Sequence, residues 1–307
     1  MNNIEKFNCL FSNNEKIVDC YKFVKKIGIK YAYNLTLREK FKDACGYKLN
    51  LTNPQTFSEK IQWIKVNCHN SLITQCADKY KVRDYVFEKS KNKYLSHIYG
   101  VWDNPEKIDF DSLPLSFVLK TNHASGQVII VKDKNILNTK MIKKQLCEWL
   151  SENYYYTGGE WAYKNISPLV MCEELLEEGI IDYKFYCFNG LPKFLYVSKG
   201  LEGNPHDAKM SFVDLKWNLT PFQRSNYLRF DNLPSQPLVF KEMLDLASKL
   251  SAPFCFVRVD LYSIKDRIVF SELTFYPNGG FAPFEPKEWE VEIGNWIKLP
   301  INSGGKV

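Results

Sequence analysis

Two acidic residues near the carboxyl end of the chain are spaced so that a β-hairpin would bring them face to face. Residues 256–275 alternate apolar and polar side chains around a turn that we place at Asp266, a pattern typical of paired strands. This register puts Asp260 directly opposite Glu272 on one face. Facing carboxylates repel unless a cation lies between them, and oxygen ligands without histidine or cysteine favour Mg²⁺ or Mn²⁺.

The same register places Arg258 opposite Thr274 on that face. An alternative to a metal site is therefore an ion network in which Arg258 neutralises both carboxylates. If a metal separates them, neutralising one carboxylate should relieve repulsion in the metal-free protein and raise its melting temperature. The pattern of residues leaves both interpretations open.

Lysines at the ends of apolar strands form a second group of candidates. Lys120 ends the apolar run 117–120, and the small-residue loop 121–126 follows it. The backbone N–H groups of such a loop can approach phosphate oxygens, although it matches neither glycine-rich phosphate motif, and an ordinary polar turn is the alternative. Lys184 also lies in an apolar run, and the acidic pair 173–174 either begins a functional hinge or is a solvated connection.

Regular elements that would position these residues follow from local patterns. A turn at 53–55 precedes a helix capped by Thr56 or Ser58, and Asn189-Gly190 is a strong hairpin signal. The other expected helices cover 77–89, 137–153 and 238–250, and the expected strands cover 117–120, 128–131, 169–172, 182–188 and 192–197. These elements predict an α+β fold.

Composition and charge limit the possible classes of protein. The 307 residues carry a formal charge of +6, and residues 1–50 contain ten Lys/Arg against five Asp/Glu. Segment 15–44 has apolar residues at helical spacing beside lysines, so we expect a basic amphipathic helix. Its basic face is either solvated and packed on the body, or contacts an anionic membrane surface or acidic glycan. No nucleic-acid-binding motif accompanies the charge.

The nine cysteines are scattered without a C-x-x-C pair, and no long apolar run occurs. We therefore expect reduced thiols and a cytoplasmic protein, with membrane association through 15–44 as an open alternative.

Several ordered strings resemble the teichuronopeptide-biosynthesis (TupA-like) ATP-grasp family over about residues 53–298. They are NPQTFSEKIQWIK (53–65), ADKYKVRDYV (77–86), GVWDNPEKIDFDSLP (100–114), FVLKTNHASG (117–126), NYYYTGGEWAYKNISP (153–168), DYKFYCFNGLPKF (182–194), FVRVDLY (256–262) and ELTFYPNGG (272–280).

The resemblance implies a fold in which two α+β lobes clamp ATP between antiparallel sheets. It implies an amino-terminal region 51–114, a small lobe 115–172 and a large lobe 173–300 with the metal site. The basic helical arm 1–50 and the tail 301–307 flank these parts and lie outside the resemblance.

The resemblance also implies roles for individual residues. The residues that would bind ATP are Lys79, Arg83, Lys120, Asn122, Ser125, Gly126, Glu173, Glu174, Leu176, Asp182 and Lys184. Asp260, Glu272 and Thr274 would hold Mg²⁺ (or Mn²⁺), and Arg258, Lys184 and Asn278 would act in catalysis. One departure is that ATP-grasp sites commonly end in Glu-x-Asn, whereas this chain has threonine at 274.

The activity implied is carboxylate–amine ligation: a carboxylate attacks the γ-phosphoryl group of ATP, and an amine displaces phosphate from the acyl phosphate. In cell-surface polysaccharide or capsule biosynthesis, the partners would be an amino acid or amine and the uronic-acid carboxylate of a glycan, which may be lipid-linked. The alternatives are an ATP-grasp kinase that phosphorylates a sugar or polyol, and a nucleotide-binding protein without catalysis.

Overall fold

The computed structural model describes residues 36–91, 93–176, 180–200, 208–224, 228–265 and 267–300. The chain divides into two compact units, Met1–Leu49 and Asn50–Val307. In the first unit, residues 36–45 are helical. The rest of the basic helix predicted over 15–44 lies outside the described residues, as does the tail 301–307. None of the helices described has the length and apolar character needed to cross a membrane.

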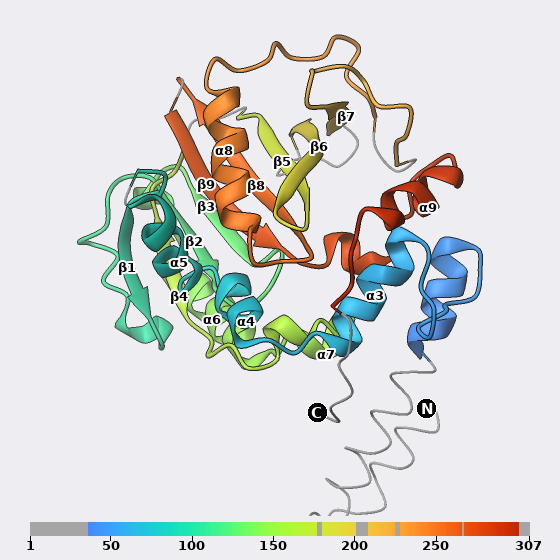
Figure 1. Ribbon diagram of the computed structural model, residues 1–307. Helices are drawn as coiled ribbons and strands as arrows, with labels where there is room; N and C mark the ends of the chain where they lie inside the picture. Colours follow the sequence, from blue (N-terminus) through green and yellow to red (C-terminus); the bar gives the residue numbers. More distant parts are fainter. Residues whose placement is uncertain are drawn as a thin grey trace, which may run out of the picture. The chain divides into compact units, whose positions relative to one another are not determined.

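A four-stranded antiparallel sheet forms one half of the second unit (Figure 1). Its strands run in the order β1-β4-β2-β3, with the bounds β1 (Ile98–Trp102), β2 (Phe117–Thr121), β3 (Val128–Val131) and β4 (Val170–Glu173). Helix α6 (Thr139–Ser151) packs on it through Leu146, which joins Phe117 and Leu119 in a buried apolar cluster. The predicted hairpin around the loop 121–126 is confirmed, with Lys120 paired to Val128.

A five-stranded antiparallel sheet forms the other half and carries the larger core (Figure 1). Its order is β7-β6-β5-β8-β9, with the bounds β5 (Asp182–Phe188), β6 (Leu191–Lys199), β7 (Lys209–Asp214), β8 (Phe256–Ile264) and β9 (Arg267–Thr274). Helix α8 (Phe240–Ser251) packs against β5, β6 and β8. The α+β class and the two antiparallel sheets agree with the sequence prediction.

The turn between β5 and β6 is the one predicted from Asn189-Gly190. Both residues have positive φ, 49° and 81°, as the two central residues of a type I′ turn require. Glycine meets this requirement without steric cost, and asparagine is among the residues that tolerate it best. The predicted hairpin is therefore confirmed, and the two residues that predicted it have the positive φ angles that its turn requires.

Three short helices precede the first sheet: α3 (Phe57–Asn67), α4 (Ser71–Ala77) and α5 (Val82–Ser90). Thr56 caps α3 and forms a capping box with Glu59, which confirms one of the two predicted caps. The continuous helix predicted over 77–89 is wrong. Asp78 accepts hydrogen bonds from the N–H groups of Tyr80 and Lys81, and this Asx-type turn competes with helix and separates α4 from α5.

The remaining elements connect or cover the sheets. They are α7 (Tyr155–Gly158), α9 (Glu288–Asn295) and the 3₁₀ turns η1 (Pro105–Lys107), η2 (Lys134–Ile136), η3 (Trp161–Tyr163) and η4 (Pro277–Gly280). Helix α9 approaches the start of α3 so closely that a Cβ on Gly294 would lie 2.3 Å from the Gln55 carbonyl oxygen. Glu290 of α9 accepts the Ser58 N–H at 3.0 Å, and this contact fixes the two helices together.

The parts 51–114, 115–172 and 173–300 remain predictions, and strand β1 of the four-stranded sheet falls within the first of them. The seven cysteines of the described residues form no disulfide with one another, as expected.

Candidate active site

The hairpin of β8 and β9 places the predicted acidic pair as expected. Asp260 pairs with Glu272, and Arg258 pairs with Thr274. The predicted register is therefore confirmed at the four residues that matter for chemistry.

Nearer the turn, the register differs from the prediction by one residue. Ile264 pairs with Arg267, whereas a turn centred on Asp266 would pair it with Ile268. An irregularity between Asp260 and Leu261 shifts the register and restores the predicted pairs beyond it. Asp266 itself lies outside the described residues.

Arg258 bridges the facing carboxylates. Its Nε and Nη2 donate to the two oxygens of Asp260 at 2.7 and 2.5 Å, a bidentate pair. Nη2 also donates to Glu272 Oε1 at 3.3 Å and Thr274 Oγ1 at 3.0 Å, and Lys184 Nζ lies 3.4 Å from Asp260 Oδ2. These contacts match the alternative in which Arg258 neutralises the acidic pair.

The two carboxyl groups differ in their proton affinity. Complete burial raises the pKa of Asp260, and although the charges of Arg258 and Lys184 oppose this rise, they do not cancel it. Burial would also raise the pKa of Glu272, but the cations Lys79, Arg258 and Lys184 outweigh burial and lower that pKa to about 2. Glu272 is therefore ionised throughout the physiological range.

These carboxylates fit a magnesium ion unequally. Glu272 lines two cavities, whereas Asp260 lines neither of them, and both Asp260 oxygens are already bonded to Arg258. In the described residues there is no group of three or more His, Cys, Asp or Glu side chains that could hold a metal. Mg²⁺ usually binds one or two carboxylates together with phosphates and water, so Glu272 fits this role, and Asp260 would require Arg258 to move.

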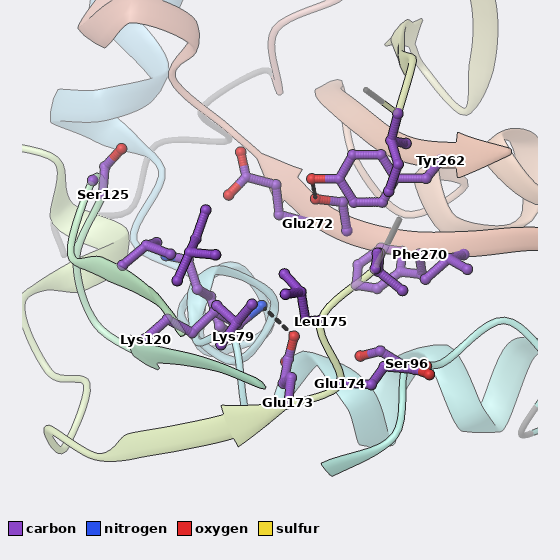
Figure 2. Close-up of a pocket in the computed structure, with 18 of the residues that line it drawn as sticks. Lys79, Ser96, Lys120, Ser125, Glu173, Glu174, Leu175, Tyr262, Phe270 and Glu272 are labelled. Atoms are coloured by element: carbon purple, nitrogen blue, oxygen red, sulfur yellow. Dashed lines mark hydrogen bonds and ion pairs between the residues drawn. The ribbon is translucent and has the colours of Figure 1, made fainter. Parts of the chain in front are cut away.

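A first cavity of about 250 Å³ lies between the two sheets. Lys79, Lys120 and Lys184 line it, and in Figure 2 the ammonium of Lys120 meets the carboxylate of Glu173, 2.8 Å away. In the same view, Ser125 lies at the left, Glu272 near the middle, and Ser96 and Phe270 at the right (Figure 2). One part of the cavity therefore contains lysine ammonium groups near the Glu173 carboxylate. A less polar part lies beside the segment that follows β4.

That less polar part suits a planar base. Apolar side chains from both sheets and from the connection line it: Val118, Val128, Ile130, Leu175, Leu176, Ile180, Val269 and Phe270. Glu174 fixes the connection, because its carboxylate accepts the His97 N–H at 3.0 Å and the Arg267 guanidinium at 2.9 Å. The N–H of Glu174 bonds to the His97 carbonyl, so a backbone N–H that contacts a bound base would have to come from a neighbouring residue.

The interruption between α4 and α5 brings Lys79 into the cavity. Its N–H donates to the Asn122 carbonyl at 3.0 Å, and its ammonium bonds the Ala124 carbonyl, so the loop 121–126 is tied to it. Burial lowers the pKa of Lys79, and the nearby Lys120 lowers it further, against the acids Glu272, Asp78 and Glu173. An added anion such as a phosphate would stabilise this cluster of lysines.

Three of the predicted nucleotide ligands line neither cavity. Asn122 is fully buried, and its amide bonds Asp78, the Ser167 carbonyl and the Leu169 N–H. Its role is therefore to hold the loop. Arg83 donates to the Ser96 carbonyl at 2.6 Å behind the cavity wall. Asp182 lies 3.5 Å from the ammonium of Lys184 and positions that lysine.

A second cavity of about 250 Å³ adjoins the first, because Ser125 and Glu272 line both. The predicted residues Arg258, Thr274 and Asn278 line it. Gly279, from the string ELTFYPNGG, also lines it, whereas sequence reasoning missed its other walls: Tyr154, Glu160, Tyr163, Tyr196, Met210, Arg224 and Tyr276. The available signal for Glu160 was its isolation, since 153–172 contains no other acid and many aromatic residues, whereas nothing in the sequence around Arg224 marked it.

Glu160 is the acid of this second cavity and is 8 % exposed. Burial raises the pKa of Glu160 from 4.5 to about 7, with Glu272 adding to the rise and Lys65 opposing it. The native protein therefore holds a proton between pH 4.5 and 7 that the unfolded chain has lost.

Stability should consequently fall as pH rises through this window. In Glu160→Gln this loss is absent. We therefore expect the free energy of unfolding of the variant, relative to that of wild type, to rise by up to about 3 kcal/mol between pH 5 and pH 8. Urea unfolding of both proteins across this range measures the difference, with the exposed Glu148→Gln as control. A difference that does not change with pH would show that Glu160 is ionised throughout.

The family model for TupA-like ATP-grasp proteins matches residues 59–298. The chain therefore belongs to the TupA-like ATP-grasp family, whose members typically bind ATP with Mg²⁺. The sequence resemblance that began near residue 53 is confirmed. A search of curated proteins found no match.

The solved structures that this chain resembles include three ligases. The D-alanine–D-alanine ligase from Helicobacter pylori has a TM-score of 0.42 and 15% identity, covering 79% of this chain and 69% of that one. The D-alanine–D-alanine ligase from Bacillus anthracis with ATP has a TM-score of 0.37 and 14% identity, covering 65% and 53%. The ligase PsnB with its minimal precursor has a TM-score of 0.39 and 10% identity, covering 66% and 53%. The chain thus spans about half the length of the last two, and its family assignment rests on the family model.

Proposed function

We propose that this protein is an ATP-dependent, ADP-forming carboxylate–amine ligase. It would join an amino acid or amine to the uronic-acid carboxylate of a cell-surface glycan. Family membership supports the use of ATP. The observation that carries the proposal is that two cavities meet at Ser125 and Glu272, one lined by lysines and the other by two arginines and an acid.

The first cavity would hold the nucleotide. The apolar part beside Leu175 and Leu176 would take adenine, and Lys79, Lys120 and Lys184 would neutralise the phosphates. Mg²⁺ on Glu272 would supply further charge neutralisation of the phosphates. Phosphoryl transfer requires mainly positioning and charge neutralisation, which these groups provide.

Arg258 would act where the two cavities meet. Its guanidinium is oriented by Asp260 and reaches Glu272 and Thr274. A terminal phosphoryl group near Glu272 would lie within reach of this fixed cation, which stabilises charge on the phosphoryl oxygens. The loop 121–126, tied to Lys79, would cover the phosphates from the other sheet.

The proposal predicts that Lys120→Met weakens ATP binding about tenfold to a hundredfold, because a charge-assisted contact to phosphate is lost. Lys120 is the better choice than Lys184, whose removal would leave two buried acids without a partner. Calorimetric titration of ATP checks this, with Lys107→Met, an exposed lysine on η1 paired with Asp103, as the matched control. Equal affinity in both variants would contradict the nucleotide site.

The reaction itself is tested with a carboxylate substrate that carries heavy oxygen. Attack on ATP through an acyl phosphate places one labelled oxygen in the released phosphate when the amine displaces it. Amide formation with unlabelled phosphate would contradict the acyl phosphate. A stable phosphorylated hydroxyl product, formed without any amine, would identify the kinase alternative instead.

A further inference from the structure

The second cavity contains a buried cation that makes no ion pair with the described residues. Arg224 is 5 % exposed and lines this cavity. Its Nη1 donates to the Tyr186 hydroxyl at 3.1 Å and to Asn278 Oδ1 at 2.7 Å, whereas Nε and Nη2 have no hydrogen-bond partner among the described residues. In the part of the chain that the structure describes, no carboxylate lies within ion-pair distance of Arg224.

This arrangement leaves the charge of Arg224 only partly compensated. The ring of Phe284 lies 4.6 Å from the guanidinium carbon, and such a contact stabilises a cation by about 0.5–2 kcal/mol. Burial raises the pKa of the Glu290 carboxyl, and the charge of Arg224 opposes this rise, but the two side chains form no ion pair, and burying a charge costs several kcal/mol. An anionic group of a ligand in the cavity would therefore be strongly stabilised by Arg224, and guanidinium matches a carboxylate in shape and charge.

The acid of the same cavity lies beside the same loop. Arg224 bonds Asn278, and the next residue, Gly279, is close to Glu160: a Cβ there would lie 3.6 Å from Glu160 Oε1. The buried ammonium of Lys65 holds this loop by donating to the Gly279 carbonyl at 2.6 Å and to the Gly158 carbonyl at 3.3 Å. Arg224 and Glu160 therefore lie beside two consecutive residues of one loop, Asn278 and Gly279.

The lining of the cavity limits what it can hold. Besides Arg224 and Glu160, its walls include four tyrosines, which present apolar rings with hydroxyl groups, and the charged side chains of Arg258 and Glu272. A ligand that satisfies both Arg224 and Glu160 must carry an anionic and an amino group.

We propose that this cavity binds an amino acid as the amine substrate, with its carboxylate on Arg224 and its amino group toward Glu160. The assignment rests on the proposed ligase function and selects an amino acid over a simple amine. The glycan carboxylate would then enter from outside this cavity and meet the amine near Glu272.

The proton balance of the step is simple. The ammonium of the amino acid gives one proton to the Glu160 carboxylate, and the free amine attacks the carbonyl carbon of the acyl phosphate. The C–N bond forms, the C–O bond to phosphate breaks, and the second nitrogen proton leaves with the phosphate. Burial raises the pKa of Glu160 to about 7, which suits a carboxylate that must accept a proton near neutral pH.

Binding to the full chain, saturated with ADP and Mg²⁺, tests the assignment. The probes are the twenty common amino acids, the amines that correspond to them without the carboxylate, and glucuronate, each titrated calorimetrically. We expect at least one amino acid to bind, its decarboxylated amine to bind at least tenfold more weakly, and Arg224→Gln to weaken amino-acid binding at least tenfold with ADP affinity within twofold of wild type.

Arg224→Lys keeps the charge in case the glutamine variant unfolds, and we expect it to retain more amino-acid affinity than Arg224→Gln.

Glu160→Gln should lower kcat about a hundredfold or more, as expected for loss of a general base, with the KM for ATP unchanged. If ADP binds but no amino acid does, or if glucuronate is the ligand that depends on Arg224, the assignment is wrong and the nucleotide site stands. If ADP itself fails to bind, the proposed function fails.

Discussion

Replacing Asp260 with asparagine should lower the free energy of unfolding by about 3–5 kcal/mol, the usual cost of removing one partner from a buried ion pair. Asp260 is fully buried, accepts both arms of the Arg258 guanidinium and lies 3.4 Å from the ammonium of Lys184. Asparagine has nearly the same shape but no charge, so the variant would leave two buried cations without their shared anion. Chemical denaturation of the metal-free protein measures the loss.

Asp103→Asn provides the matched control, because it makes the same chemical change in an ion pair on the surface. We expect this control to unfold at the wild-type midpoint, since exposed ion pairs contribute little. A rise in the stability of Asp260→Asn would mean that repulsion between the facing carboxylates dominates. That rise is what the metal interpretation of the sequence predicts, so the experiment separates the two interpretations.

The residues that sequence reasoning placed well are those set by local geometry. Two-residue alternation and the nearby turn determine which side chains of β8 and β9 share a face, so the pairs Asp260–Glu272 and Arg258–Thr274 follow from spacing. The turn itself was misplaced, and the irregularity after Asp260 compensated for this error. Local spacing cannot reveal such an irregularity, which depends on how the strand packs.

Competition between local signals explains why the continuous helix predicted over 77–89, which includes Lys79, was wrong. The apolar spacing of 77–89 favours one helix, whereas the Asp78 side chain captures the N–H groups of Tyr80 and Lys81. The Asn122 amide, from another part of the fold, also donates to Asp78 Oδ1 and supports the turn. This distant partner is invisible in the local pattern, yet it places Lys79 in the first cavity.

Strand β1 was missed for a different physical reason. Its sequence contains Gly100, which is disfavoured within strands, and its burial does not alternate. In the structure, a Cβ at this position would lie 2.3 Å from the ring of Trp102. Glycine is therefore required by the packing of a neighbouring side chain, and the register shift near Ile98 has no local signal.

The second cavity could not be predicted because its walls come from distant segments. Glu160 precedes η3, Arg224 follows β7 in an irregular segment, and Asn278 belongs to η4. The contacts that join them, such as Arg224 with Asn278 at 2.7 Å, exist only once both sheets and their connections are packed. Arg224 therefore has no periodic or motif signal in the sequence.

Glu272→Gln should lower ATP-dependent turnover by at least about a hundredfold and raise the Mg²⁺ concentration for half-maximal activity at least tenfold, because the carboxylate proposed to bind Mg²⁺ loses its charge. Glu272 is the carboxylate that lines both cavities. Nearby cations hold its pKa at about 2, so it remains an anion from pH 5 to pH 8. The wild-type dependence on Mg²⁺ should therefore not weaken through this residue as pH falls across that range.

Glu174→Gln is the matched control for this measurement. It removes a carboxylate that lines the first cavity but is engaged by the His97 N–H and Arg267, so its Mg²⁺ dependence should equal that of wild type. Rates are measured by ADP release across a Mg²⁺ titration, and chelation followed by readdition of Mg²⁺ checks reversibility. If Glu272→Gln keeps the wild-type Mg²⁺ dependence, the metal is held elsewhere and Glu272 serves mainly as a counter-ion for Arg258 and Lys79. Because Glu272 lies where the two cavities join, a raised Mg²⁺ requirement together with unchanged ATP affinity in the absence of metal would place the metal at that junction.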